Sequence, residues 1–376
     1  MTWREWAEHQ RRDIRRAGQW RAPRDLDAAG PEGKLAPDDR PVVSFASNDY
    51  LGLTQHPAVV AAARAALDRW GAGSGSARLI VGSRPVHSDL EAALAAWKRT
   101  PRAVLFPTGF AANLGVLTTF GGPGVLVVSD ELNHASIIDG CRLSRSPVEI
   151  TRHADPDHVD AVLAGSDHVR AIVVTDTVFS MDGDVAPVDD LAAVCAERGA
   201  LLVLDEAHAA LGPDLADLAD RTPDLELVRI GTLSKMLGSL GGFAATSEPF
   251  ADLIVNRARS YIFTTASTPA DAAAAMAAVE VVRSDEGRRL RARLQRHVER
   301  VRAGHPSPIV PIVIGDEAAT IAASEALLER GMLVPAIRPP TVAPGSSRLR
   351  IALSAAHTDA QISTLVEALA TIDPRR

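Results

Sequence analysis

The chain has 376 residues and a mass of 39.7 kDa, with 46% hydrophobic and 23% charged residues and a mean hydropathy of +0.03. This length and composition are those of a folded globular protein with a large core and exclude a mostly disordered chain. The formal net charge of −7 argues against nucleic-acid binding, and no apolar run reaches the roughly 18 residues that a membrane span needs.

Residues 1–20 carry charges of both signs and lack the continuous apolar stretch of a secretory signal. They predict an amphipathic helix, and we expect a cytoplasmic protein. Residues 22–44 are rich in Pro, Gly and Asp and predict a loop that crosses to the main body. The arginine-rich stretch 288–302 predicts a solvated helical face, like that of the first helix.

Between residues 102 and 246, short apolar runs alternate with helical patterns. This alternation predicts a mostly parallel sheet covered by helices. Polar residues end several runs, and ligands in such folds bind outside the carboxyl ends of the strands. The expected strands are 103–106, 125–129, 171–176, 200–205 and 227–232, and the polar residues are Asp130, Asp176, Asp205 and Thr232.

The C-terminal third has a different pattern. Residues 268–302 have helical spacing, and they precede strand-like runs, a further helix and a final helix, which together predict a smaller α+β domain. The strand-like runs are 309–316, 331–337 and 348–354. We therefore expect an N-terminal helix and crossing segment at 1–45, a large α/β domain at 46–268 and a small α+β domain at 269–376.

Four patterns suggest other chemistries and are set aside. The two cysteines, Cys141 and Cys195, have no CxxC spacing and are expected to be inert core thiols, and none of the 11 histidines has a metal-binding spacing. The letters DEAH at 205–208 spell a helicase motif, but no GxxxxGK[ST] loop accompanies them to bind triphosphate. The glycine-rich GAGSGS at 71–76 does not complete GxGxxG and predicts a flexible loop that contacts a ligand.

Lys235 is the strongest candidate for a reactive side chain. It lies in GTLSKMLGSLGG and is one of three lysines in the chain, with Lys34 and Lys98. Small neighbours let a ligand approach closely, and a desolvated amine becomes a nucleophile that forms Schiff bases. A solvated surface lysine is the alternative. A pyridoxal cofactor also needs a carboxylate for its ring nitrogen and a cradle for its phosphate.

Other segments offer those two groups. Asp205 ends a buried run, where a protonated pyridine nitrogen would be a suitable partner; the alternative is an N-cap or a structural ion pair. The segment 106–115 leads through Thr108, Gly109 and Phe110 into a helix, whose free N–H groups suit a phosphate; an ordinary helix start is the alternative. His134 is expected either to lie against the cofactor ring or to make a local hydrogen bond.

Seven segments of the chain match the pattern of one known family. They are SNDYLGL (47–53), GSGSARLIVGSRPVHSDLE (73–91), FPTGFAAN (106–113), DELNHAS (130–136), FSMDGDVAPV (179–188), DEAHA (205–209) and TLSKMLGSLGG (232–242). With these segments the chain resembles the α-oxoamine synthases, pyridoxal-phosphate enzymes that join an amino acid to an acyl thioester and release carbon dioxide. The resemblance runs nearly end to end and implies the fold of the type I pyridoxal-phosphate transferases, which is like that of aspartate aminotransferase.

Within the family, residues 336–358 are similar to the members that use L-alanine and a pimeloyl thioester, carried by coenzyme A or by an acyl carrier protein. A sibling activity is the alternative, such as glycine C-acetyltransferase or 5-aminolevulinate synthase. A pyridoxal-binding protein without turnover is the alternative from another class, and the presence of Asn48, Arg350 and Asp205 argues against it.

The resemblance implies a role for each matching residue. Lys235 would hold pyridoxal 5'-phosphate as a covalent aldimine, Asp205 would pair with the ring nitrogen, and His208 would hydrogen-bond the phenolic oxygen. His134 would stack on the ring and contact the substrate. The other implied contacts are Gly109, Phe110, Ser180 and Thr232 to the cofactor, Thr264 or Thr265 to the cofactor from the second subunit of a homodimer, Asn48 and Arg350 to the amino-acid carboxylate, and Arg21 and Thr341 to the acyl substrate.

Overall fold

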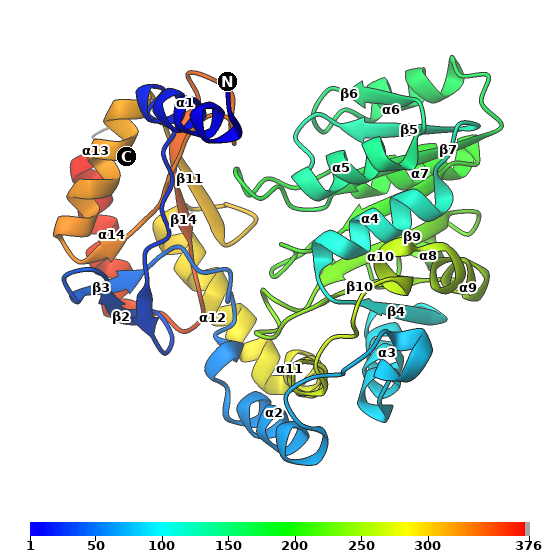
Figure 1. Ribbon diagram of the computed structural model, residues 1–376, viewed down its shortest axis with the longest axis horizontal. Coiled ribbons are helices and arrows are strands. Elements are labelled where there is room, and N and C mark those ends of the chain that lie inside the picture. The colour runs from blue at the N-terminus through cyan, green and yellow to red at the C-terminus, as the bar shows by residue number, and fades with distance from the viewer. Residues whose placement is uncertain (373–376) are drawn as a thin grey trace. The chain divides into compact units, whose positions relative to one another are not determined.

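The computed structural model describes residues 1–372 and consists of two compact units (Figure 1). The larger unit holds residues 47–310 and 352–367, and the smaller unit holds residues 1–46, 311–351 and 368–372. Among residues 1–372, no helix has both the length and the apolar character of a membrane span. The division into domains at residues 45 and 268 stays a prediction.

A seven-stranded sheet of order β4-β10-β9-β8-β7-β5-β6 forms the centre of the larger unit. Its strands pair in parallel except β10, which runs antiparallel to both neighbours. The mostly parallel sheet and its five predicted strands are therefore confirmed. The strands are β4 (Arg102–Phe106), β5 (Val125–Asp130), β6 (Val148–Thr151), β7 (Arg170–Asp176), β8 (Leu201–Asp205), β9 (Glu226–Thr232) and β10 (Gly242–Thr246).

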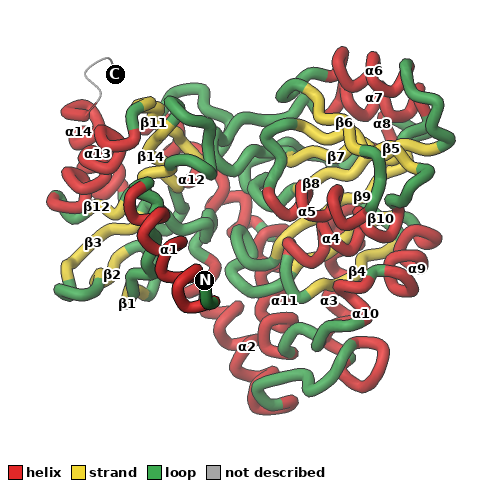
Figure 2. The backbone as a smooth tube through the Cα atoms, turned by 45° about the horizontal axis from the view of Figure 1, so that its top comes forward, coloured by secondary structure: helices red, strands yellow, loops and turns green. Residues whose placement is uncertain are grey.

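Alternate residues of the central strands enter two different cores, because successive side chains of a strand point to opposite faces. Val127 and Val203 lie in one core, and Leu126 and Leu202 lie in the other. Figure 2 shows helices along both faces of this sheet. The first core is covered by α4 (Gly109–Phe120), α5 (Ala135–Ser144), α9 (Glu248–Arg257) and α10 (Arg259–Ile262), and the second by α6 (Pro156–Ala164), α7 (Val188–Arg198) and α8 (Leu218–Arg221).

The remaining helices of the larger unit lie outside these two layers. In this group α11 packs against α2 and α3. Both cysteines are buried in the larger unit. Burial raises the pKa of Cys141 to about 11 and that of Cys195 to about 12, as expected of inert thiols. The elements are η1 (Leu53–Gln55), α2 (Pro57–Trp70), η2 (Arg78–Gly82), α3 (Pro85–Lys98), α11 (Pro269–Arg283) and α12 (Asp285–Val301).

The smaller unit contains most of two short sheets, of order β1-β2-β3-β12 and β11-β14-β13. The prediction of a loop at 22–44 was wrong, because three strands form there. These strands have three to five residues each and few apolar side chains, so they leave no apolar run in the sequence. The elements are α1 (Trp3–Arg16), β1 (Leu26–Ala28), β2 (Glu32–Leu35), β3 (Arg40–Ser44), β11 (Ile309–Gly315), α13 (Glu317–Glu329), β12 (Met332–Leu333), β13 (Ala336–Ile337) and β14 (Ser347–Ala352). The final helix, α14 (Asp359–Ile372), has residues 359–367 in the larger unit and 368–372 in the smaller one.

The four predicted polar strand ends are confirmed, since each is the last residue of its strand in the large sheet. Strands β5, β7, β8 and β9 run parallel to one another, so their carboxyl ends meet at one edge of the sheet. This edge is where an open α/β sheet places its ligands. The residues at that edge are Asp130, Asp176, Asp205 and Thr232.

Candidate active site

Lys235 and His208 are in contact at the carboxyl edge of the large sheet. Lys235 lies in the turn that follows β9, and its Nζ is 2.8 Å from Nε2 of His208. The turn depends on Gly238, whose φ is +60° and where an added Cβ would lie 2.5 Å from the backbone nitrogen of Thr54. Only glycine combines an unstrained positive φ with the absence of a Cβ, so the glycine-rich sequence after Lys235 shapes the loop that presents the lysine amine.

Tyr50 connects His208 to Asn48. Its hydroxyl donates to Oδ1 of Asn48 at 3.0 Å and lies 2.6 Å from Nδ1 of His208. Because a hydroxyl has one proton, Tyr50 accepts from Nδ1–H of His208, and Nε2 therefore accepts from the amine of Lys235. Both the tyrosine and the histidine are buried, so this arrangement holds the amine at a defined place.

Asp205 is a buried carboxylate that receives hydrogen bonds from neutral donors. Asn113 Nδ2 donates to its Oδ2 at 2.7 Å, and the backbone N–H of Ala207 donates to its Oδ1 at 2.9 Å. No cationic side chain forms an ion pair with it in the described part of the chain. A buried carboxylate is costly without a positive partner, so this position suits a ligand with a protonated ring nitrogen.

A second buried carboxylate, Asp176, lies beside Asp205 on the neighbouring strand. Its Oδ2 accepts from the backbone N–H of His134 at 2.7 Å. Burial, followed by the charge of Asp205, raises the pKa of Asp176 well above its usual range. The charge of Lys235 acts in the opposite direction and lowers the pKa of the same carboxyl.

His134 lies at the beginning of α5, where it is the N-cap residue. Burial lowers its pKa, the charge of Asp205 raises it and that of Lys235 lowers it. The local hydrogen bond that the sequence offered as an alternative is present, because Nδ1 accepts from the backbone N–H of Ser136 at 3.2 Å. His134 therefore both caps the helix and stands within electrostatic reach of Lys235 and Asp205.

The first turn of α4 lies against the end of β9. Thr108 caps the helix by accepting from the N–H of Ala111 at 3.0 Å, and a Cβ added at Gly109 would lie 3.3 Å from Cβ of Thr232. The first N–H groups of a helix have no partner within the helix and carry partial positive charge. These N–H groups are suited to bind a phosphate. Thr232 lies beside them, and its hydroxyl donates to the backbone oxygen of Gly241 at 3.0 Å. The exposed Phe110 follows directly.

The remaining predicted residues lie in three other places. Ser180 is in the turn after β7, and Thr264 and Thr265 are in the segment between α10 and α11. That segment is held by Ser74 and His87, which both bond the backbone oxygen of Ser267, at 2.6 and 2.9 Å. The smaller unit holds the predicted substrate residues Arg21, Thr341 and Arg350.

Two of those residues share a cavity. Arg21 and Thr341 line one space of about 300 Å³ in the smaller unit, together with Arg338. Arg338 donates to the backbone oxygen of Gly18 at 2.6 Å and so holds the segment that leads to Arg21. The third substrate residue, Arg350, is buried in β14. The structure thus brings together the two residues that were predicted to contact the acyl substrate.

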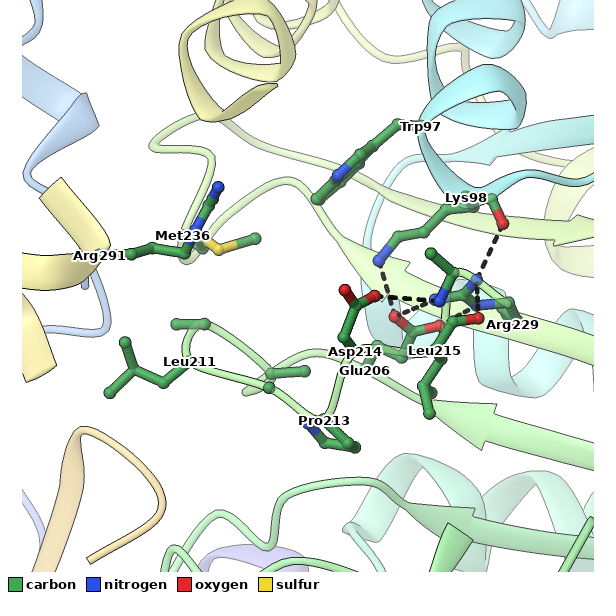
Figure 3. A pocket seen from close by; sticks show the side chains of 14 residues that line it. Trp97, Lys98, Glu206, Leu211, Pro213, Asp214, Leu215, Arg229, Met236 and Arg291 are labelled. Atoms are coloured by element: carbon green, nitrogen blue, oxygen red, sulfur yellow. Dashed lines mark hydrogen bonds and ion pairs between the residues drawn. The ribbon is translucent and has the colours of Figure 1, made fainter. Parts of the chain in front are cut away.

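A buried ion triad supports the segment from Asp205 to His208. Lys98 Nζ lies 2.7 Å from Oε2 of Glu206, and the Nη2 of Arg229 donates to the same oxygen at 2.9 Å. Burial acts to raise the pKa of Glu206. The charges and hydrogen bonds of Lys98 and Arg229 together have the larger effect and lower this pKa to about 2. Figure 3 shows the three side chains converging beside a pocket of about 300 Å³. The triad fixes the residue directly after Asp205.

Sequence reasoning missed three residues that contact the predicted ones. Tyr50, Asn113 and Ser136 bond His208, Asp205 and His134, respectively. Each stands inside a segment that carries the family resemblance, SNDYLGL, FPTGFAAN or DELNHAS. Their position in those segments was the available signal, although it does not reveal which side chain each one contacts.

Comparison with known proteins agrees with this geometry. Residues 40–369 match the family Aminotransferase class I and II. The chain is 48% identical over 365 residues to the 8-amino-7-oxononanoate synthase of Anaeromyxobacter dehalogenans, covering 93% of this chain and 92% of the relative.

Two solved structures are also similar. A serine palmitoyltransferase solved with pyridoxal phosphate as an internal aldimine has a TM-score of 0.89 and 28% identity, covering 97% of this chain and 96% of its own. The 8-amino-7-oxononanoate synthase of Francisella tularensis has a TM-score of 0.74 and 26% identity, covering 88% of this chain and 97% of its own.

Proposed function

The chain belongs to the aminotransferase class I and II family, and we infer that it joins L-alanine to a pimeloyl thioester in biotin biosynthesis. The products are 8-amino-7-oxononanoate, carbon dioxide and the free thiol carrier. The observation that carries this inference is the contact between the Lys235 amine and His208, next to the buried carboxylate of Asp205, in a chain 48% identical to a relative of that name.

The site residues fit pyridoxal phosphate. When bound, this cofactor stabilises the negative charge that develops on the α-carbon of the amino acid. We propose that Lys235 binds its aldehyde carbon and that Asp205 pairs with its ring nitrogen, which supplies a positive partner that the carboxylate lacks among residues 1–372. The further proposed contacts are His208 to the phenolic oxygen, His134 to the ring face, and Gly109, Phe110, Ser180 and Thr232 to the remainder of the cofactor and its phosphate.

In the reaction, the Lys235 amine acts as the base that removes the α-proton of alanine and later returns a proton. His208 supports this role, because its Nε2 accepts a hydrogen bond from Nζ and so holds the amine in place. Asn48 and Arg350 would bind the alanine carboxylate, a task for which a planar guanidinium is well shaped. Arg21 and Thr341, which share a cavity, would contact the acyl chain.

We further propose a homodimer in which Thr264 or Thr265 reaches the cofactor of the partner subunit. The support is that the loop carrying both residues is held by hydrogen bonds from Ser74 and His87, so the loop has a fixed conformation for contact with a second copy. The pimeloyl carrier is coenzyme A or an acyl carrier protein, both of which present the same thioester.

A four-way assay tests the activity. Purified protein with pyridoxal phosphate is incubated with alanine or glycine, each paired with pimeloyl-CoA or acetyl-CoA, and the release of carbon dioxide and thiol is measured. We expect turnover with alanine and pimeloyl-CoA. Turnover confined to glycine and acetyl-CoA would assign the chain to the sibling activity. A protein that binds the cofactor without exchanging the α-proton of alanine in heavy water would be a binding protein.

A further inference from the structure

A series of hydrogen bonds connects His134 to Asp205 through Ser136 and Asn113, two residues that have no assigned role. The Oγ of Ser136 lies 2.7 Å from Nδ1 of His134, and it accepts from Nδ2 of Asn113 at 2.9 Å. The same Nδ2 donates to Oδ2 of Asp205 at 2.7 Å. Asn113 belongs to α4, Ser136 to α5 and Asp205 to β8, so these hydrogen bonds connect three elements at the carboxyl edge of the sheet.

The directions of these bonds follow from the number of protons. Asn113 Nδ2 has two hydrogens, one for Asp205 and one for Ser136. Since the Ser136 hydroxyl already accepts from Asn113, its own proton is directed at Nδ1 of His134. The backbone N–H of Ser136 also points to Nδ1, at 3.2 Å. With two donors facing Nδ1, the neutral His134 ring must carry its proton on Nε2.

Burial and charge favour the same arrangement. Asn113 and Ser136 are each 1% exposed, so water does not compete for these bonds. If the amide of Asn113 were turned over, its oxygen would face the Asp205 carboxylate, which is a repulsive contact. The amide oxygen has no hydrogen-bond partner among the described residues, so the orientation is set by the two bonds of Nδ2. Burial also lowers the pKa of His134, which favours its neutral form.

We propose that Asn113 and Ser136 are positioning residues that hold His134 in its Nε2-protonated form and fix the carboxylate of Asp205. The proposal rests on the proposed use of His134 and Asp205 as cofactor contacts. Asn113 and Ser136 link the carboxylate of Asp205 to the imidazole of His134, because the amide nitrogen that orients Asp205 also directs the Ser136 proton to the imidazole. Loss of either residue therefore changes the histidine tautomer as well as cofactor affinity.

The first test uses Ser136→Ala, with Ser144→Ala as the matched control. Ser144 is also a buried serine of α5, but its hydroxyl donates to the backbone oxygen of Cys141 at 2.6 Å. Nitrogen-15 NMR of labelled histidines, with His134 assigned by its loss in His134→Gln, reports the tautomer in the holoenzyme. We expect Nδ1 of His134 to be unprotonated in the wild-type protein, and Ser136→Ala to populate both tautomers. We also expect Ser136→Ala to weaken pyridoxal phosphate binding about tenfold, since a buried hydrogen bond is lost.

A proton on Nδ1 in the wild-type protein, or a Ser136→Ala variant that matches Ser144→Ala in both measurements, would overturn the proposal. The test also separates this inference from the proposed function. A wild-type protein that forms no product from alanine and pimeloyl-CoA contradicts the function, while the tautomer of His134 is read independently of turnover.

The second test uses Asn113→Asp, which keeps the size of the side chain. It places a carboxyl group against Asp205, so the two can coexist only when they share a proton. We expect cofactor affinity to fall at pH 8.5 and to recover toward the wild-type value at pH 6. A loss of affinity that is equal at both pH values would indicate a purely structural role and would contradict the assignment of Asn113.

Discussion

The Nζ of Lys235 lies 2.8 Å from Nε2 of His208. This contact places the amine of Lys235 against a ring nitrogen that can accept a hydrogen bond from it. The other ring nitrogen, Nδ1, bonds the hydroxyl of Tyr50, which in turn bonds Asn48. Hydrogen bonds therefore connect Asn48, Tyr50, His208 and Lys235 in that order. The amine is therefore positioned by a continuous line of polar side chains that begins at a proposed substrate contact.

Tyr50 gives the first prediction. Tyr50→Phe removes the hydroxyl that bonds His208 and Asn48, and a bond of this kind contributes roughly 1 kcal/mol, or about fivefold. We expect kcat with alanine and pimeloyl-CoA to fall about five- to tenfold. Tyr261→Phe is the control, because Tyr261 is the other tyrosine of the chain and packs against Phe106. Steady-state kinetics that show equal rates for both variants would contradict a role for Tyr50.

His153 predicts a pH dependence of stability. Its ring nitrogens bond Asp130 at 3.0 Å and Asp184 at 2.6 Å, and these hydrogen bonds raise the pKa of His153 to about 10. The folded protein holds this proton more tightly than the unfolded chain, whose histidine has a pKa of about 6.5. The stabilisation is therefore complete below about pH 6.5 and is lost as the pH rises to about 10.

The measurement is urea unfolding of the wild-type protein and His153→Gln at pH 6, 8 and 10. We expect the wild-type protein to be more stable at pH 6 and the difference to shrink steadily toward pH 10. The other titrating groups are common to both proteins and cancel in the difference. A gap that does not change with pH would mean that His153 is uncharged in the folded protein.

The buried ion triad predicts a large loss of stability. Glu206→Gln removes the carboxylate that Lys98 and Arg229 share, and leaving buried charges without a partner costs about 3–5 kcal/mol. Denaturant unfolding at pH 7 measures this loss, with Glu226→Gln as the exposed control. Because the pKa of Glu206 is about 2, the stabilisation is present above about pH 4.5 and is lost as the pH falls toward 2. A cost below about 1 kcal/mol would contradict this role.

Lys235 gives a prediction about turnover. Lys235→Ala removes both the proposed cofactor anchor and the proposed base, so we expect product formation to fall at least about a thousandfold. Lys34→Ala, an exposed change in β2, is the control and should keep the wild-type rate. Near-normal turnover by Lys235→Ala would refute the mechanism.

Much of the large sheet could be predicted from the sequence because its central strands are buried on both faces. Such strands are continuous apolar runs, and five of the seven had that form. β6 was missed because three of its four residues are exposed, and β10 because its sequence, GFAAT, has few large apolar residues. The strands at residues 26–44 were missed for a related reason, since they are short and mostly polar.

The candidate site divides in the same way. Lys235 and Asp205 could be proposed because the sequence around each one is unusual, and the family resemblance added His208. The side chains that orient these three residues could not be predicted, because each contact joins segments that are distant in the sequence. Tyr50 and His208 are 158 residues apart, and Asn113 and Asp205 are 92 residues apart. No local pattern records such a pairing, which depends on how the strands and helices are arranged in space.

The identity of the lysine that carries the cofactor is the most direct test of the account. The purified protein is loaded with pyridoxal phosphate, reduced with borohydride to make the link permanent, digested and mapped by mass spectrometry. The chain offers three lysines, Lys34, Lys98 and Lys235, so the result is unambiguous. We predict the added mass on Lys235 alone. Modification of Lys34 or Lys98 in its place, or no modification of Lys235, would contradict the central claim.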